Sequence, residues 1–341
     1  MTSDLIPVSI LTGFLGSGKT TILSRLIENP SFVDTAIIVN EFGEVGLDHV
    51  LLQTSEETIV DLSCGCICCT IRGDLIATLN DLIRKRQSGE VPPFRRVVIE
   101  TTGLADPAPI VHTLMQEPSI FSNYCLARII ASIDGVSGYD TLDNYLESRK
   151  QLALADVVFL TKVDLIKDEN LLKQLEVRIK KINPGATYVE CIGGDVSPDF
   201  FFTDGMSATA LGILEKKISD LEQEKPLDTA LHRHPDILTY AIERRRPISR
   251  GALGVFMQML ADQKGSDILR LKGIVALTDD ITRPAIIHGV QHVIYPVTRV
   301  DAWPKEISNS TLVMIVNGIE KNWVENLLKQ VCDSSYASLC V

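Results

Sequence analysis

The sequence predicts an α/β fold in which a domain with a mostly parallel sheet is followed by a smaller α+β domain with an antiparallel sheet. Up to about residue 190, apolar segments alternate with segments of helical periodicity, as in parallel strands connected by helices. From about residue 268 to residue 316, apolar strand patterns follow one another without helices between them, which indicates antiparallel neighbours. The length of 341 residues and the apolar content of 45% suffice for two cores.

The first predicted strand, Pro7–Thr12, runs directly into the glycine-rich loop Gly13–Thr20, and a helical pattern follows at Thr21–Ile27. The letters GFLGSGKT match the P-loop motif in the strand–loop–helix context that this motif requires. Its glycines let backbone N–H groups surround an oligophosphate, Lys19 can reach the β- and γ-phosphates, and Thr20 offers a hydroxyl to Mg²⁺. The chain is therefore predicted to bind a nucleoside triphosphate and to be a P-loop NTPase.

The net charge of the chain limits the classes of partner that it is expected to bind. A net charge of -11 argues against general binding to nucleic acids or to membrane surfaces. No apolar run reaches the ~18 residues that span a bilayer, and the N-terminal Met-Thr-Ser-Asp lacks the basic region of a signal peptide. We therefore expect a cytoplasmic protein with no nucleic-acid partner and no membrane partner.

An acidic loop at 41–48 follows the second predicted strand, Thr35–Asn40. It carries three carboxylates and two glycines at the position where P-loop GTPases have their first switch. Carboxylates beside a phosphate site usually serve a cation, because bare repulsion would be unfavourable. A solvated acidic loop is the alternative interpretation.

Four of the eight cysteines lie in Cys64–Cys69, between a strand predicted at Thr58–Leu62 and a helix predicted at Ile71–Ile83. Soft thiolates suit Zn²⁺ or another late divalent metal, and not Mg²⁺. No second Cys or His pair is evident at the spacing of a structural zinc site, which favours an open, exchangeable site. Redox chemistry and inert buried cysteines are the alternatives. The scattered cysteines are interpreted as core or tail residues: Cys125, Cys191, Cys332 and Cys340.

Glu100 is a further candidate functional residue, at the end of the strand predicted at Arg95–Glu100. An acid at the carboxyl end of a central strand beside a P-loop is where a Walker-B carboxylate holds Mg²⁺ or its water shell. Gly103 follows and is expected to provide mobile backbone near the γ-phosphate. The alternative is a strand-end acid without a function.

The nucleotide base is indicated by Thr161–Asp164, which follows a strand predicted at Asp156–Leu160. The letters TKVD differ by one residue from the guanine-reading NKxD pattern. Asp164 can accept hydrogen bonds from both the ring N–H and the exocyclic amine of guanine, which adenine cannot supply. Thr161 in place of Asn is expected to loosen the support of neighbouring loops and to leave Asp164 in place. The sequence therefore predicts GTP as the nucleotide.

The remaining elements complete the two domains. We expect a strand at 126–134, a single helix at 139–153, a helix at 167–183 and a strand at 187–190, and then a domain boundary between 208 and 217. In the second domain we expect strands at 237–243, 268–277 and 311–316, two strands or one bent strand at 285–300, and helices at 249–262 and 321–331. His288 and His292 are expected to share one strand face, as half-exposed polar positions or as a nucleotide or metal contact. His232 and His234 are interpreted as part of a solvated linker, with metal binding as the alternative.

Taken together, these motifs resemble the CobW-type metallochaperone GTPases, which are related to the accessory GTPases of urease and hydrogenase maturation. The resemblance covers essentially the whole chain and is carried by GFLGSGKTT (13–21), NEFGEVGLD (40–48), GCICC (65–69), ETTGLADP (100–107) and TKVD (161–164). In the second domain it is carried by RRRP (244–247), LRLKGIV (269–275), HGVQHV (288–293) and the pair Trp303-Pro304. Cys64 is an addition to the family pattern.

The resemblance implies a P-loop GTPase domain at 1–215, a linker at 216–235 and a CobW-type C-terminal α+β domain at 236–341. It implies slow GTP hydrolysis that drives transfer of zinc, or cobalt, to a client metalloprotein, by a monomer or homodimer. A GTP-controlled adaptor with a static zinc site is the rival function. The implied catalytic residues are Lys19, Glu41 and Glu100, with Glu44 as a second switch acid. The implied nucleotide site comprises Gly13, Gly16, Ser17, Gly18, Lys19, Thr20, Thr21, Lys162 and Asp164. The implied metal ligands are Thr20 and Glu100 for Mg²⁺, and Cys66, Cys68 and Cys69 for Zn²⁺ or Co²⁺.

Overall fold

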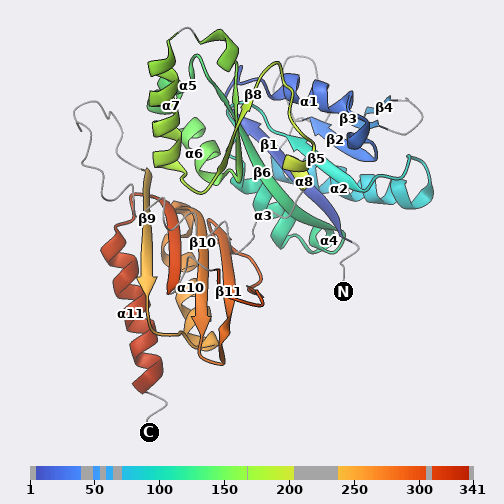
Figure 1. The fold of residues 1–341 in the computed structure, drawn as a ribbon. Helices are drawn as coiled ribbons and strands as arrows, with labels where there is room; N and C mark the ends of the chain where they lie inside the picture. Colours follow the sequence, from blue (N-terminus) through green and yellow to red (C-terminus); the bar gives the residue numbers. More distant parts are fainter. Residues whose placement is uncertain are drawn as a thin grey trace. The chain divides into compact units, whose positions relative to one another are not determined.

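The computed structural model describes residues 5–39, 49–53, 59–63, 71–166, 168–202, 237–304 and 309–337. They form two compact units, one containing the described residues up to 176 together with 186–202, and the other containing 177–185 and 237–337. Each unit has its own sheet (Figure 1). In the described ranges no helix is long and apolar enough to cross a membrane.

The sheet of the first unit has the strand order β4-β3-β2-β5-β1-β6-β7-β8. Its strands are β1 Ile6–Gly13, β2 Thr35–Val39, β3 His49–Gln53, β4 Ile59–Ser63, β5 Arg96–Glu100, β6 Tyr124–Asp134, β7 Val157–Thr161 and β8 Thr187–Cys191. The strands from β2 to β8 in this order are parallel, whereas β3 pairs antiparallel with both β2 and β4. All carboxyl ends of the parallel strands therefore meet at one edge of the sheet.

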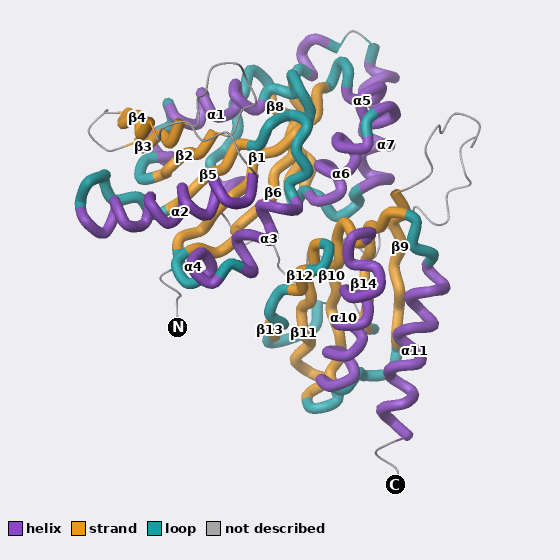
Figure 2. Tube along the Cα trace, turned by 180° about the vertical axis from the view of Figure 1, so that it is seen from behind, coloured by secondary structure: helices purple, strands orange, loops and turns teal. Residues whose placement is uncertain are grey.

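Helices connect these strands and lie on both sides of the sheet (Figures 1 and 2). They are α1 Lys19–Ile27, α2 Ile71–Ser88, α3 Ala108–Gln116, α4 Pro118–Phe121, α5 Gly138–Asn144, α6 Leu146–Leu154, α7 Glu169–Ile182 and α8 Asp199–Phe202. Short 3-10 turns occur at η1 Pro30–Phe32 and η2 Val163–Leu165. The core beneath α1 contains a ring cluster in which Phe32 and Phe159 both contact Phe201. Burial of these large apolar side chains stabilises the sheet, and the loops at its carboxyl edge are connected to this stable core.

The sheet of the second unit has the order β12-β11-β10-β14-β9, with β13 paired to β11, and all of these pairs are antiparallel. The strands are β9 Ile237–Arg244, β10 Ile268–Leu277, β11 Asp280–Val290, β12 Val293–Ile294, β13 Thr298–Arg299 and β14 Ser310–Asn317. The helices α10 Arg250–Lys264 and α11 Lys321–Ala337, with a turn η4 at Gly265–Asp267, complete the unit. One cluster of buried side chains joins α10 and α11 to the sheet, with Phe256 and Leu260 fully covered.

The predicted fold class is confirmed: a mostly parallel sheet with helices precedes an antiparallel α+β layer. Some predicted elements were wrong in detail. The single helix expected at 139–153 is divided into α5 and α6, because Tyr145 is extended at φ -122° and ψ 119°. Its ring packs in a tilted arrangement against that of Phe14, with 4.5 Å between the ring centroids, a contact over long sequence distance that periodicity does not reveal.

In the second unit, residues 285–300, expected as two strands or one bent strand, belong to three strands: β11 ends at Val290, and the short strands β12 and β13 follow it. His288 and His292 therefore do not share a strand face. His292 lies in the turn before β12, and its Nδ1 is 2.9 Å from the carbonyl oxygen of Ala261 near the end of α10. The expected domain boundary, the linker, His232 and His234 lie outside the described residues and stay predictions.

Candidate active site

The glycine-rich loop joins the end of β1 to the start of α1 at the carboxyl edge of the sheet. Gly13, Gly16 and Gly18 have φ values of 145°, 73° and 90°, a region that residues with a Cβ rarely adopt. A Cβ on Gly13 would also lie 2.7 Å from Ser17 Oγ and would collide with Ser132. The loop conformation therefore requires glycine for both backbone and packing reasons.

Lys19 is the first residue of α1, and its side chain folds back over the loop. The Nζ atom donates hydrogen bonds to the carbonyl oxygens of Gly13 at 2.9 Å and Phe14 at 3.2 Å. Lys19 is only 8% exposed, so these acceptors replace lost hydration of the ammonium group. An ammonium group held against the rim of a glycine-rich loop is placed to meet an anion there.

Thr20 and Glu100 are joined across the sheet edge. The hydroxyl of Thr20 donates to Glu100 Oε1 at 3.0 Å, and Glu100 is 3% exposed at the end of β5. Hydroxyl and carboxylate oxygens are the hard ligands that Mg²⁺ prefers. The donor set present here therefore fits Mg²⁺.

The segment after Glu100 contacts both the end of β1 and the glycine-rich loop. Thr101 donates its N–H to the carbonyl oxygen of Leu11 at 2.9 Å. Gly103 is buried so closely against Leu15 that a Cβ would lie 2.6 Å from the Leu15 nitrogen. The amide of Gln151 then donates to the carbonyl oxygens of Gly103 at 3.1 Å and Ala105 at 3.0 Å. Gly103 thus allows the backbone to pack closely against Leu15. This role differs from the mobile backbone that was expected from the sequence.

The loop after β7 contains Lys162 in a left-handed conformation, with φ at 55°. Lys162 Nζ lies 2.6 Å from Asp134 Oδ2, and Asp134 Oδ1 accepts from the N–H groups of Val136 and Ser137. Burial by itself would raise the pKa of Asp134. The hydrogen bonds from Lys162 and the two backbone N–H groups outweigh this effect and lower the pKa below its ordinary value. Asp164 is exposed in η2, two residues beyond Lys162.

Thr161 connects this loop to the glycine-rich loop. Its hydroxyl lies 2.9 Å from the carbonyl oxygen of Ser17 and 3.2 Å from that of Ile133. A Cβ built on Gly18 would lie 3.4 Å from the methyl carbon of Thr161. Thr161 is 4% exposed, so this is a buried link between the loops, present despite the departure from Asn at this position.

Several predicted site residues lie outside the described residues: Glu41, Glu44, Cys64, Cys66, Cys68 and Cys69. Within the described ranges, no group of three His, Cys, Asp or Glu side chains is arranged to hold a metal ion. Cys125, Cys191 and Cys332 lie at separate positions in the described ranges and are not joined in disulfides there. The structure thus brings together the P-loop residues, Glu100 and the Thr161–Asp164 loop at one sheet edge, and it leaves the thiolate site as a prediction.

Sequence reasoning missed three residues that organise this edge: Ser132, Asp134 and Gln151. Asp134 had a detectable signal, because it ends a predicted strand and precedes a glycine, as expected for a residue at the carboxyl edge. Ser132 Oγ lies 2.7 Å from Ser17 Oγ, and Gln151 reaches the segment after Glu100 from α6. Neither contact has a local sequence pattern that could have identified it.

The comparisons with known proteins follow the same division of the chain. Residues 7–190 match the family model of the CobW/HypB/UreG nucleotide-binding domain, and residues 237–332 match that of the cobalamin synthesis protein cobW C-terminal domain. The zinc chaperone YjiA of Escherichia coli is 30% identical over 311 residues, which cover 91% of this chain and 93% of YjiA. The zinc chaperone CobW of Sinorhizobium sp is 26% identical over 300 residues, which cover 79% of this chain and 80% of that protein.

Among solved structures, the Zn(II)-bound YjiA GTPase from E. coli superposes with a TM-score of 0.71 at 27% identity, covering 96% of this chain and 99% of YjiA. The fold, the geometry of the sheet edge and the two family matches agree with one another. The chain therefore belongs to the CobW/HypB/UreG family, with a nucleotide-binding domain followed by a CobW C-terminal domain.

Proposed function

We propose that this protein is a GTP-hydrolysing metallochaperone that binds zinc through the thiolates of Cys66, Cys68 and Cys69 and transfers it to a client metalloprotein. The observation that carries this proposal is one row of residues across the first sheet. Ser63 pairs with His49, His49 with Val39, and Val39 with Glu100. The strand that leads into the cysteine stretch therefore ends on the same edge as the proposed Mg²⁺ ligand.

The spacing along this row makes coupling between the two sites physically reasonable. Three strand-to-strand steps separate Ser63 from Glu100, which amounts to about 14 Å. The acidic stretch begins at Glu41, two residues after Val39, which lies in the middle of the row. A change at the phosphate site thus has a short connection through the sheet to the strand that leads into the cysteines.

GTP is the substrate of the first site. The glycine-rich loop and Lys19 bind the phosphates, Thr20 and Glu100 hold Mg²⁺, and Asp164 accepts hydrogen bonds from guanine. Bound Mg²⁺ supplies positive charge that offsets the charge on the phosphate oxygens. Turnover is expected to be slow, because no arginine finger is identifiable in the sequence.

Zinc is the cargo of the second site, and the names of two relatives, both zinc chaperones, favour zinc over cobalt. In this proposal, Glu41 and Glu44 respond to the γ-phosphate and its cation in the GTP-bound form, and the zinc affinity of the three thiolates rises. Hydrolysis removes the γ-phosphate contacts, and the metal affinity falls. By linkage, zinc must tighten GTP binding by the same factor by which GTP tightens zinc binding. Cysteines in this role must stay reduced, which is consistent with a cytoplasmic location.

The experiment is a competitive Zn²⁺ titration against a chromophoric chelator in the apo, GDP-bound and non-hydrolysable GTP-analogue-bound states. We expect the highest zinc affinity with the GTP analogue, by roughly tenfold or more over GDP. The triple variant Cys66→Ser/Cys68→Ser/Cys69→Ser should lose this zinc binding and keep its GDP affinity. Equal zinc affinity in all three states would contradict the chaperone function and favour a GTP-controlled adaptor with a static zinc site. A reversible disulfide without stoichiometric metal would indicate a redox sensor.

A further inference from the structure

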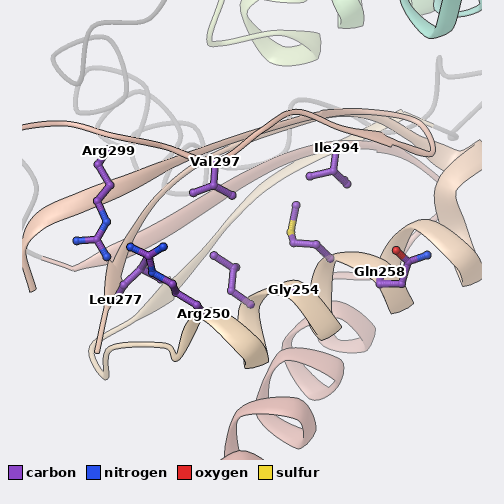
Figure 3. A pocket seen from close by; sticks show the side chains of 9 residues that line it. Arg250, Gly254, Gln258, Leu277, Ile294, Val297 and Arg299 are labelled. Carbon is purple, nitrogen blue, oxygen red and sulfur yellow. The ribbon is translucent and has the colours of Figure 1, made fainter. Parts of the chain in front are cut away.

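The second unit contains a groove between α10 and the chain segment with β12 and β13, with a volume of about 580 Å³ (Figure 3). Arg250 and Arg299 line one end of it, and Asp279 pairs with both of them, at 2.8 Å and 2.5 Å. Asp280 also lies 3.8 Å from Arg299. This neutralised end and the aliphatic side chains beside it do not select a particular ligand. The first unit, by contrast, contains a buried polar side chain whose contacts lead to the proposed GTPase site.

Gln151 is this side chain, a fully buried amide on α6 with 0% of its surface exposed. Its Nε2 donates hydrogen bonds to the carbonyl oxygens of Gly103 at 3.1 Å and Ala105 at 3.0 Å. Only the NH₂ end of an amide can donate to two carbonyl oxygens, so these contacts fix which way the amide group points. Both N–H donors of Gln151 are therefore used by one backbone segment, the one that follows Glu100.

The contacted segment forms a turn, which is closed by a hydrogen bond from the N–H of Ala105 to the carbonyl oxygen of Thr102 at 3.1 Å. Gly103 and Leu104 are its central residues, and the hydrogen bond of the turn does not use their own N–H groups. A trans peptide bond directs its C=O and N–H to opposite sides. Because Gln151 holds the carbonyl oxygen of Gly103, the N–H of Leu104 is directed away from the amide of Gln151.

The turn also packs against the glycine-rich loop. A Cβ on Gly103 would lie 2.6 Å from the backbone nitrogen of Leu15. Just before the turn, Thr101 donates its N–H to the carbonyl oxygen of Leu11 at 2.9 Å. The turn begins two residues after Glu100, the proposed Mg²⁺ ligand. Gln151 thus holds a turn that contacts both α6 and the glycine-rich loop and starts beside this ligand.

The helix α6 contacts the same segment at a second point. Lys150 Nζ lies 3.2 Å from Asp106 Oδ2, and both side chains are 28% exposed. Water and salt screen a partly exposed ion pair, whereas the hydrogen bonds of the buried Gln151 are protected from both. We therefore expect Gln151 to contribute more than Lys150 to the orientation of the turn.

We propose that Gln151 is a positioning residue for GTP hydrolysis, a role that rests on the function proposed above. Through its two hydrogen bonds it holds the turn at 102–105 against the glycine-rich loop. The glycine-rich loop, Lys19 and Asp164 supply the affinity for the nucleotide, and within the described ranges Gln151 makes no hydrogen bond to any of them. A small displacement of groups around a reacting centre lowers the rate far more than the affinity. Loss of the Gln151 amide should therefore lower turnover and leave nucleotide binding intact.

The test compares Gln151→Met, which has a similar length but no N–H donor, with a matched control. The control is Ser148→Ala, because Ser148 is also buried on α6, and its Oγ has no hydrogen-bond partner within the described part of the chain. Titration with labelled GDP counts the binding sites of each full-length protein, and GTP turnover is then measured per site. We expect Gln151→Met to lower kcat about tenfold or more, with KM and GDP affinity within about twofold of wild type. Ser148→Ala should match wild type in all three.

Hydrogen exchange gives a measurement that does not depend on turnover. In the GDP-bound proteins, amides at 101–106 should exchange at least about fivefold faster in Gln151→Met than in wild type, because two hydrogen bonds to this segment are lost. Peptides from α1 and β6 should exchange at the wild-type rate. If Gln151→Met has no GDP-binding sites, Gln151→Asn is the second variant, since it keeps an amide but is one methylene too short, and the same results are expected.

The outcomes separate this role from the proposed function. A wild type that hydrolyses GTP, with an equal kcat per site in Gln151→Met, would overturn the positioning role alone. Lower GDP affinity at unchanged kcat, or faster exchange throughout the unit, would also overturn it, because Gln151 would then support binding or general stability. A wild type that does not hydrolyse GTP would overturn the proposed function together with this role.

Discussion

Lys162 and Asp134 form an ion pair of 2.6 Å that joins the loop after β7 to the end of β6. Lys162 has a left-handed backbone conformation and directly precedes η2, which contains Asp164. Since Asp134 also accepts hydrogen bonds from the N–H groups of Val136 and Ser137, contacts within the protein orient the carboxylate that pairs with Lys162.

The first prediction concerns removal of this pair. Asp134→Asn should weaken GDP binding about five- to tenfold, because a charge-assisted hydrogen bond contributes about 1–1.5 kcal/mol to ordering the loop. Fluorescence titration with a labelled GDP measures the effect. Asp140→Asn, an exposed acid on α5, is the matched control and should have wild-type affinity. Equal affinities for both variants would show that the pair does not prepare the base site.

The second prediction is a pH dependence. The pKa of Asp134 is lowered in the folded protein, so the pair stabilises the fold above the ordinary carboxyl pKa of about 3.9. This contribution is lost as the pH falls below that value and through the lower folded-state pKa. Wild type should therefore lose melting temperature more steeply than Asp134→Asn between about pH 4 and pH 3. Parallel melting curves of the two proteins in thermal denaturation would contradict this assignment.

The third prediction tests the link from Thr161 to the glycine-rich loop. Thr161→Ala removes a buried hydroxyl that reaches Ser17, and it should cost about 1 kcal/mol of stability and several-fold in GDP affinity. Thr161→Ser keeps the hydroxyl and should retain most of both. Calorimetry with GDP and chemical denaturation provide the two numbers. A Thr161→Ala protein that matches wild type in both would mean that the two loops are independent.

The fourth prediction concerns Mg²⁺ and hydrolysis. Glu100→Gln keeps the shape of the side chain but removes the charge, and it should lower GTP turnover roughly 10²-fold. Thr20→Ala should likewise abolish the tightening of nucleotide binding by Mg²⁺. Phosphate release and nucleotide titrations with Mg²⁺ or with EDTA measure both effects. Persistence of the Mg²⁺ effect in both variants would place the cation elsewhere.

The fifth prediction concerns Gly103. An alanine there would place its Cβ 2.6 Å from Leu15 N and 2.7 Å from Leu15 Cα, so Gly103→Ala should destabilise the domain by about 1–3 kcal/mol. Gly251→Ala, where no described heavy atom lies within 4 Å of the new Cβ, is expected to be neutral or slightly stabilising. Denaturant unfolding compares the two. A neutral Gly103→Ala would show that the P-loop yields easily to its neighbour.

Some site residues could be predicted from the sequence because their chemistry follows directly from local order. Gly13–Thr20 lies between a strand and a helix, and Glu100 and Thr161 each end a parallel strand. Carboxyl ends of parallel strands meet at one edge, so these positions converge wherever the strands are correctly predicted. The division into a parallel and an antiparallel domain follows from periodicity in the same way.

The sequence by itself thus determined the fold class, the P-loop and the acid at the end of β5, since each is specified by neighbours along the chain. Only the tertiary structure decided the contacts between segments distant in sequence: Tyr145 with Phe14, Gly103 with Leu15, and Lys162 with Asp134. The physical reason is that such contacts depend on how packed elements face one another. Hydrophobic periodicity fixes which side of an element is buried, but it does not specify which distant side chain it will meet.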